Sequence, residues 1–479
     1  MIDQADLVVV GGGIAGMTAA NRAAELGAKV IVLEKGKDEH YLCNSRIATG
    51  VLNVAHTDPH FGPAVLRKAI ELDTEGYATP ALADLLADTA ARSMEWLRSE
   101  GVHIVKVPIH NKSRWMLAPP REFSAGLDWK DRGADVALQT LGANFKRREG
   151  TLMLGTRGKK LLLDGKRCVG IVAEHRHSLD IEATCVLLAD GGFQSNPDLV
   201  RRFISLRPEA LTQRCAGTGQ GDALIMAEEA GARLTDATAF YGHLLSRDSL
   251  TNPGLWPYPT MDTLAGGGVM INRSGRRFLD EGLGGIAHCN ALARSDDPLA
   301  ATLIIDNAIW ESAGRAELVP PNPTMVPAGG TLIMAPNLGM LAAHLSIPAT
   351  TLAATISEYN RAVMANEGKK LNPPRTPGRM FGESRSSGPR ADVAPIATAP
   401  FYAIPLAAGI SYTMGGIEID AQARAIGRDG SPIPGLYAAG SCTGGIEGGR
   451  IGGYVGGYLK AVTLGLIAGE TIGAVCQRD

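Results

Sequence analysis

Three glycines and one acidic residue near the start of the sequence have the spacing of a dinucleotide-binding turn. Gly11, Gly13 and Gly16 form a G-x-G-x-x-G pattern, and Glu34 follows it. In such a turn the first glycine allows a tight bend, the second lets the backbone approach a pyrophosphate, and the third lets a helix pack against a strand. The acidic side chain can accept both ribose hydroxyls, which favours an adenosine with a free 2′-OH. These residues therefore predict a dinucleotide site.

The elements that must position these residues are also visible in the sequence. Residues 7–10 form an apolar run typical of a buried parallel strand, and an alanine-rich helix follows the glycine turn and ends near Gly27. Residues 29–33 form a second strand that leads to Glu34. Because strand, turn, helix, strand and acid occur in one register, a purely structural glycine turn is a poor explanation. The fold class predicted is α/β.

The remaining chain alternates helical and extended patterns, and its composition changes in the middle. A helix is predicted over residues 78–100, and a helix followed by three strands over residues 133–174. Further elements are predicted as strands over 181–188 and 433–440 and a glycine-rich helix from 451 to about 472. Between about 236 and 410, proline, histidine and tryptophan become more frequent. We therefore predict a separate cap inserted into the first domain.

Composition limits the classes of partner. With 479 residues, two domains are expected. Lysine and arginine total 47 and acidic residues 49, so we expect no nucleic-acid partner. The seven cysteines include no C-x-x-C pair, which favours a reduced cytoplasmic compartment, and no metal site is predicted. No apolar run approaches about 18 residues without glycine or charge, so we expect no membrane span. The first predicted strand begins within a few residues of the N-terminus, so we also expect no signal peptide.

Several further segments occur in the order typical of one flavoprotein family. They are GGGIAG, NSRIATG, ADGGF, GTGQGDALIMAEEAGA, INRSGRRFLDE, YTMGGIEID and GLYAAGSCTGG. The sequence thus resembles, over nearly its whole length, the soluble members of the FAD-dependent fumarate reductase/succinate dehydrogenase flavoprotein superfamily, which also contains tricarballylate dehydrogenase, L-aspartate oxidase and 3-ketosteroid Δ1-dehydrogenase. The resemblance implies a Rossmann-like FAD-binding domain, with a parallel sheet and a β-meander, and an inserted α+β capping domain. The FAD-binding domain would comprise residues 1–235 and 412–479, and the cap residues 236–411.

The resemblance also implies which residues hold FAD. They are Gly11, Gly13, Ile14, Ala15, Gly16, Glu34, Lys35, Asn44, Ser45, Thr49, Gly50, Ala189, Asp190, Gly191, Thr218, Gly219, Asp222, Gly440, Ser441, Gly452 and Gly453. Membrane-bound relatives carry a histidine that is covalently joined to the flavin, and this sequence has Asn44 at that position. We therefore expect non-covalent FAD.

Members of this superfamily move a hydride between flavin N5 and a carbon next to a carbonyl or carboxylate, while an acid or base moves a proton at the neighbouring carbon. The resemblance places His243 at a substrate carboxylate. It also places Arg450 as a carboxylate clamp beside the flavin, although the loop is one residue shorter than usual. Arginine suits this role because its guanidinium binds carboxylates through two parallel hydrogen bonds.

The sequence departs from the fumarate reductases at three places among the predicted substrate-binding residues. Ser411 stands where those enzymes have histidine, and Thr260-Met261 where they have Thr-Glu. Gly284 and Gly285 occupy the position of the arginine that delivers the proton. Proton delivery by a positioned acid typically raises the rate by about 10²–10⁴, so the absence of this arginine disfavours fumarate as the substrate.

Tyr412 is the leading candidate for moving the proton, because a phenol can act as acid or base and the steroid dehydrogenases of this superfamily use tyrosines. Its replacement by phenylalanine is then expected to slow turnover at least tenfold. The predicted catalytic set is Tyr412, Arg450 and His243, and weaker candidates are His288, Tyr241, Tyr258 and Tyr454.

These observations predict an FAD-dependent oxidoreductase that transfers a hydride between flavin N5 and a carbon of a C–C or C=C bond α,β to a carbonyl or carboxylate. A mono-anion, lactone, enone or larger cyclic compound fits the reduced number of cationic residues. No second nucleotide motif is present, so a separate electron donor or acceptor is expected. The alternatives are an oxidase or hydroxylase that uses O₂ and a non-catalytic FAD-binding protein.

Overall fold

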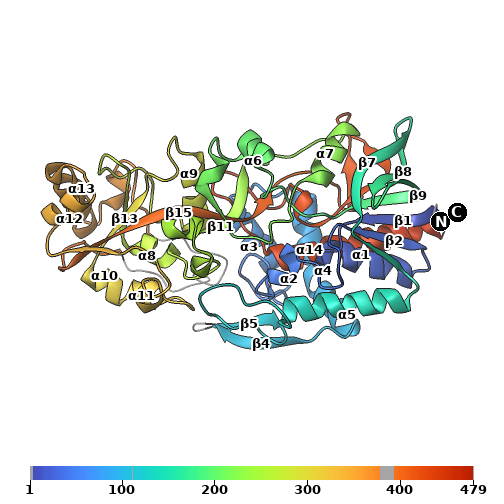
Figure 1. Ribbon diagram of the computed structural model, residues 1–479, viewed down its shortest axis with the longest axis horizontal. Coiled ribbons are helices and arrows are strands. Elements are labelled where there is room, and N and C mark those ends of the chain that lie inside the picture. Colours follow the sequence, from blue (N-terminus) through green and yellow to red (C-terminus); the bar gives the residue numbers. More distant parts are fainter. Residues whose placement is uncertain (1–3, 110–111, 378–392, 478–479) are drawn as a thin grey trace.

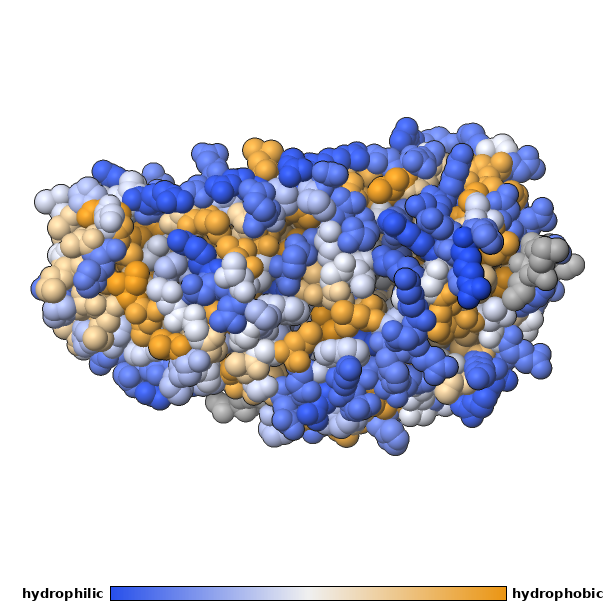
Figure 2. Space-filling view, in the orientation of Figure 1, coloured by the Kyte–Doolittle hydropathy of each residue, from blue (hydrophilic) through white to orange (hydrophobic). Residues whose placement is uncertain are grey.

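Two large β-sheets organise the chain, and the computed structural model describes residues 4–109, 112–377 and 393–477. The molecule is elongated, with the glycine turn and its sheet on the right of Figure 1 and the middle of the chain forming the left end. Figure 2 shows hydrophilic residues over most of the rim of this face, with smaller hydrophobic areas between them.

The first sheet has the strand order β16-β17-β9-β1-β2-β6. Its parallel strands are β1 (Gln4–Val10), β2 (Val30–Glu34), β6 (Thr151–Leu154), β9 (Ser178–Leu188) and β17 (Pro432–Ala438). The strand β16 (Arg424–Ile426) pairs antiparallel at one edge, and β7 (Arg157–Asp164) and β8 (Arg167–Glu174) form an antiparallel meander with β9. The predicted parallel sheet with its β-meander is confirmed.

Helix α1 (Ile14–Glu25) follows the glycine turn and packs tightly against α14 (Gly457–Cys476). A Cβ at Gly465 or Gly469 would lie only 2.4 or 2.7 Å from a backbone oxygen of α1, so the glycines of α14 allow this close approach. The helix begins at Gly457 rather than at residue 451, because residues 451–452 form a turn, Gly453 forms a bridge to Gly448, and residues 454–456 are irregular. Among the described residues only α14 is long and apolar enough to cross a membrane, and 67% of its most apolar window is buried inside the protein.

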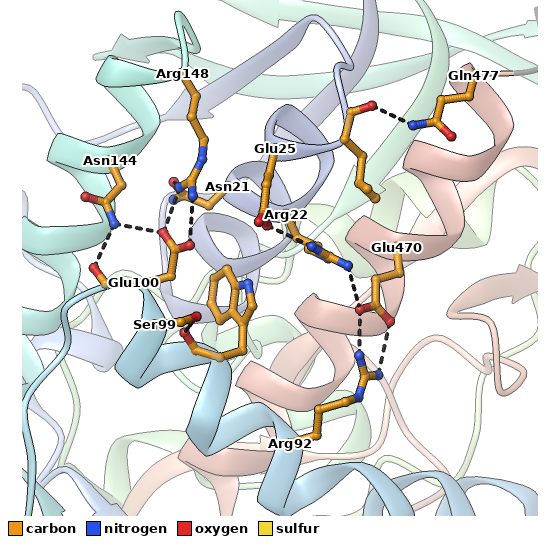
Figure 3. A network of polar contacts seen from close by, with 12 residues as sticks. Asn21, Arg22, Glu25, Arg92, Ser99, Glu100, Asn144, Arg148, Glu470 and Gln477 are labelled. Carbon is orange, nitrogen blue, oxygen red and sulfur yellow. Dashed lines mark hydrogen bonds and ion pairs between the residues drawn. The ribbon is translucent and has the colours of Figure 1, made fainter.

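A polar network connects α1 and α14 with α4 (Pro80–Ser99) and the end of α5 (Gly133–Arg147), as Figure 3 shows. The Glu470 carboxylate accepts hydrogen bonds from both terminal nitrogens of Arg92, at 2.6 and 3.0 Å, and forms an ion pair with Arg22. Arg148 donates in the same paired manner to Glu100, at 2.7 and 2.8 Å. Arg92 is 51% exposed, and a surface pair such as Arg92 and Glu470 contributes at most about 1 kcal/mol, so the apolar packing beneath it supplies most of the stability there.

The second sheet is built around β15 (Phe401–Met414), a long strand that runs from the left end of the molecule to its centre in Figure 1. Its partners are β10 (Leu211–Gln213), β11 (Ala239–Ser246), β13 (Thr302–Asp306) and β14 (Ile333–Ala335), and β12 (Val269–Ile271) pairs with β13. Because β10 precedes residue 236 and β15 continues past residue 411, backbone pairing joins the two predicted domains. The proposed domain limits stay a prediction.

Shorter elements complete the fold. They are β3 (Val51–Leu52), β4 (Ile104–Ile109), β5 (Lys112–Leu117), α2 (Asn44–Ile47), α3 (Pro63–Thr74), α6 (Pro197–Phe203), α7 (Asp222–Glu229), α8 (Asp262–Gly267), α9 (Gly285–Arg294), α10 (Asn307–Glu311), α11 (Pro321–Thr324), α12 (Leu338–His344) and α13 (Ala349–Met364). Of these, α2, α8 and α9 matter most below, because their first residues line the large cavity.

Candidate active site

Most of the residues predicted to hold the cofactor line one cavity of about 100 Å³ at the carboxyl ends of β1, β2 and β9. They are Gly11, Gly13, Ile14, Ala15, Glu34, Lys35, Asn44, Ser45, Ala189, Asp190, Gly191, Thr218, Gly219, Asp222, Gly440 and Ser441. Gly16 lies behind this wall, where a Cβ would be 2.0 Å from the Gly11 oxygen. This position suits the helix packing expected of the third glycine.

The Glu34 carboxylate is held in place by backbone donors. It accepts hydrogen bonds from the N–H groups of Gly12, at 2.9 Å, and Gly36, at 2.7 Å, and only 6% of the residue is exposed. A carboxylate has about four acceptor positions, so ribose hydroxyls can still bind. The wall near it is fixed by Lys35, whose Nζ donates to the Thr218 carbonyl at 2.5 Å.

An acceptor atom without a protein partner supports the fit of a cofactor to this cavity. Asp190 Oδ2 accepts the N–H of Ala223 at 3.0 Å, but its Oδ1 is buried and has no hydrogen-bond partner among the described residues. Burial raises the pKa of Asp190 to about 7. Because buried polar groups are nearly always satisfied, this oxygen is suited to accept a hydroxyl of a bound FAD. The residues of the cavity therefore fit the cofactor that the sequence predicts.

A second, larger cavity of about 420 Å³ lies next to the first, and Asn44 lines both. Its walls include the residues predicted to touch the flavin and the substrate. These are Asn44, Thr49, Gly50, Gly452, Gly453, Thr260, Ser411, Gly284, Gly285, His243 and Tyr412. The structure thus brings the flavin loops and the cap residues to one space. Asn44 itself is held by two hydrogen bonds, from its Nδ2 to the Ser411 carbonyl and from the Ala216 N–H to its Oδ1.

Arg450 is the exception, and its expected place beside the flavin needs correction. It does not line the large cavity, its side chain is 69% exposed, and it forms an ion pair with Glu75 at 2.9 Å. The reason is local: Gly448 and Gly453 exchange two backbone hydrogen bonds, at 3.0 and 2.7 Å, and close a tight turn with Arg450 at its tip. The side chain therefore points to solvent.

A stack of tyrosines forms one wall of the large cavity. Tyr241 and Tyr412 are paired across β11 and β15, and the ring of Tyr241 also lies 4.8 Å from that of Tyr454. The Tyr412 hydroxyl donates to Glu447 at 3.1 Å, and Glu447 forms an ion pair with Lys460 at 2.5 Å. Burial raises the pKa of Tyr412 well above its usual value. The Tyr412 hydroxyl proton is thus held in a hydrogen bond to the Glu447 carboxylate, which is already paired with the Lys460 ammonium group.

The Tyr241 hydroxyl has a different partner. It lies 2.9 Å from His243 Nε2, and His243 Nδ1 lies 2.5 Å from Asp262 Oδ2. The other Asp262 oxygen accepts the N–H of Leu244 at 2.8 Å, which fixes the carboxylate at the start of α8. Burial raises the pKa of Tyr241 well above its usual value. Tyr241, His243 and Asp262 form a hydrogen-bonded relay whose members all line the cavity.

Two arginines that the sequence analysis did not select line the same cavity. The guanidinium carbons of Arg121 and Arg214 lie 5.8 and 5.6 Å from the centre of the Tyr258 ring. Arg214 donates to the Ser411 hydroxyl at 2.8 Å. Within the described part of the chain neither arginine forms an ion pair with a carboxylate. No motif could have indicated them, because each lies in a loop and only the fold brings them together.

Carboxyl groups occupy another part of the wall. Asp262 and Glu317 both line the cavity, and the Thr263 hydroxyl donates to Glu317. Burial, with a smaller effect of Asp262, raises the pKa of Glu317 to about 7. His288, a weaker candidate, does not line the cavity; burial lowers its pKa to about 4.

Comparison with known proteins agrees with the fold and the cofactor. Residues 6–454 match the FAD binding domain family. A fumarate reductase (cytochrome) of Shewanella frigidimarina is 29% identical over 487 residues, which cover 100% of this chain and 78% of that protein. A 4-oxocyclohexanecarboxylate 2-dehydrogenase of Sinomonas cyclohexanicum is 29% identical over 82% of this chain and 69% of its own length. A vinyl phenol reductase of Lactiplantibacillus plantarum is 25% identical over 92% and 91%.

Among solved structures, the 3-ketosteroid Δ1-dehydrogenase of Sterolibacterium denitrificans has a TM-score of 0.75 at 19% identity and covers 99% of this chain and 100% of its own. This similarity concerns the fold alone. Together with the family match over most of the chain, it agrees with the observed fold. The chain belongs to the FAD binding domain family, within the fumarate reductase/succinate dehydrogenase superfamily of FAD-dependent oxidoreductases.

Proposed function

We propose that this FAD-dependent oxidoreductase of C–C bonds introduces or reduces a double bond α,β to the carbonyl or carboxylate of a small organic compound held in the large cavity. When bound, FAD supplies the hydride acceptor or donor. The chain must then hold the substrate, polarise its electron-withdrawing group and move one proton.

The observation that carries this proposal is the relay of Tyr241, His243 and Asp262. In desaturation the substrate loses a hydride from one carbon and a proton from its neighbour. Tyr241 can take that proton while its own passes to His243 Nε2, and the Asp262 carboxylate stabilises the resulting imidazolium. In reduction the proton moves in the opposite direction. A proton carrier of this kind is typically worth about 10²–10⁴ in rate.

The relatives are consistent with this assignment. The names of the fumarate reductase, the vinyl phenol reductase and the 4-oxocyclohexanecarboxylate 2-dehydrogenase each describe a change at a C–C bond. Their substrates differ, so the shared element is the reaction and not the compound. Ser411 and Gly285 stand where a fumarate-type site is expected to have a histidine and an arginine, and these replacements disfavour a fumarate-type substrate for this chain.

We further propose that FAD is bound non-covalently. An amide at Asn44 is not a nucleophile toward the flavin, and both of its ends are engaged by the backbone. Acid precipitation should therefore release a yellow flavin into the supernatant. We also propose that electrons pass to or from a separate carrier, and that the protein works in the cytoplasm, without nucleic acid or a membrane.

An anaerobic experiment tests the reaction. The reduced holoenzyme is mixed with 2-cyclohexenone and with cinnamate, and the oxidised holoenzyme with their saturated counterparts, while the flavin absorbance is followed. At least one pair should change the flavin, and Tyr241→Phe should slow this change by about 10²-fold or more. Tyr402→Phe, which removes a hydroxyl bound to Asn307, serves as the matched control. Reoxidation by air alone with release of peroxide would instead favour an oxidase.

A further inference from the structure

We infer that Arg121 and Arg214 form the anchor for a single carboxylate of the substrate, and that Asp262 and Glu317 exclude a second one. This inference rests on the proposed function and specifies its substrate class as a mono-carboxylate. It assigns specificity to residues other than Arg450, His243 and the position of Gly285.

Arg121 is a buried cation whose hydrogen bonds are incomplete. Only 4% of the residue is exposed. Its terminal nitrogens donate weakly to the carbonyls of Ile47, at 3.2 Å, and Gly126, at 3.4 Å, while Nε is buried and finds no partner in the part of the chain that the structure describes. Burial lowers the pKa of this guanidinium. An unpaired buried charge is costly, and an anion in the adjoining cavity would offset that cost.

Arg214 brings a second guanidinium to the same part of the wall. Its Nε donates to the Pro257 carbonyl at 3.1 Å and Nη1 to the Ser411 hydroxyl at 2.8 Å. Ser411 thus holds a cation, where the fumarate reductases carry a histidine. Both guanidinium groups contact the Tyr258 ring, so they lie around one side chain. Two planar guanidinium groups can share the two oxygens of one carboxylate.

The carboxyl groups on the cap side oppose a second negative charge. Asp262 is bound to His243, and Glu317 accepts a hydrogen bond from the Thr263 hydroxyl. Glu281 also lines the cavity but is neutralised by Arg277 in an ion pair at 2.5 Å. Arg375 lies behind this wall, where it binds the Gly266 carbonyl, and does not line the cavity. A dianion that spans the cavity would therefore bring one carboxylate against two others.

Binding to the oxidised holoenzyme tests the inference without turnover. The flavin absorbance is titrated with benzoate, with its neutral analogue benzamide and with the dianion terephthalate, at pH 8. Benzoate should bind at least tenfold more tightly than either of the others. Arg121→Met and Arg214→Met should each weaken benzoate at least tenfold and change benzamide less than threefold. Arg201→Met, which removes an exposed cation on α6, is the matched control.

A further variant keeps the test decisive if the arginine variants do not retain FAD. In Glu317→Gln, the ratio of the terephthalate Kd to the benzoate Kd should fall at least threefold. The inference is overturned if benzoate does not bind, if benzamide binds equally well, or if terephthalate binds best. Failure of the proposed function gives a different result. In that case the oxidised enzyme would still prefer benzoate, but no unsaturated carbonyl compound or acid would reoxidise the reduced flavin.

Discussion

Tyr412 and Tyr241 stack face to face, with ring centroids 5.1 Å apart and planes inclined by 22°, yet their hydroxyls have different partners. Tyr412 donates to Glu447, whereas Tyr241 adjoins His243. The two rings are neighbours because Tyr241 and Tyr412 are paired in the register of β11 and β15. The stack therefore separates a tyrosine whose proton is held from one whose proton can move.

This difference predicts losses of unequal size for two single-atom changes. Tyr241→Phe should lower the rate of flavin reduction or reoxidation by substrate about 10²-fold or more, while Tyr412→Phe should lower it less than tenfold. The second value revises the expectation from sequence, because Glu447 keeps the Tyr412 proton. Stopped-flow absorbance at saturating substrate measures both. A larger loss in Tyr412→Phe than in Tyr241→Phe would assign the proton to Tyr412.

The buried pair of Glu447 and Lys460 predicts a stability effect. The two side chains are 1% and 3% exposed, and Glu447 also accepts the Val455 N–H at 3.0 Å. Glu447→Gln leaves a buried ammonium unpaired and should cost about 3–5 kcal/mol of unfolding free energy. The double variant Glu447→Gln/Lys460→Met should recover part of that loss. Urea denaturation measures these values.

The exposed pair of Lys166 and Asp429 provides the control for this experiment. Its side chains are 87% and 51% exposed, so Lys166→Met should change the free energy of unfolding by less than about 1 kcal/mol. Equal effects of Lys166→Met and Glu447→Gln would show that burial of the Glu447 pair has no energetic consequence.

Glu317 predicts a dependence of stability on pH. Burial raises its folded-state pKa from 4.5 to about 7, so the folded state binds more protons than the unfolded state between these values. Stability from this group is therefore fully present below pH 4.5 and is lost as the pH rises to about 7. Glu317→Gln removes this pH dependence. The free energy of unfolding of the variant minus that of the wild type should therefore rise by roughly 1–3 kcal/mol from pH 5 to pH 8. Urea titrations at both pH values test this, and a constant difference would contradict it.

The sequence determined the nucleotide half of the site more fully than the substrate half. The roles of Gly11, Gly16 and Glu34 follow from neighbours a few residues away, because a strand, a turn and a helix fix them locally. Arg121 and Arg214 have no such signal, since one lies in the loop after β5 and the other just after β10. Only the pairing of β10 with β15 brings Arg214 to Ser411.

Arg450 illustrates the opposite error. Its motif suggested a carboxylate clamp, but the turn closed by Gly448 and Gly453 directs it to Glu75. Arg450→Met should therefore change kcat/KM less than threefold, whereas Arg214→Met should lower it at least tenfold. Steady-state kinetics under anaerobic conditions compare the two. If kcat/KM fell as much in Arg450→Met as in Arg214→Met, Arg450 would have to bind the substrate carboxylate after all.

Gly285 lies against Asp262 with no room for a side chain. A Cβ at Gly285 would lie 2.1 Å from the Asp262 carboxyl carbon and 2.3 Å from both of its oxygens. Gly285→Ala must therefore displace Asp262 from His243, and the rate of flavin reduction or reoxidation should fall at least tenfold while FAD content stays unchanged. Gly142→Ala, in α5 where a Cβ meets nothing within 4 Å, should leave the rate unchanged. Full activity in Gly285→Ala would show that the relay does not need Asp262 in its present place.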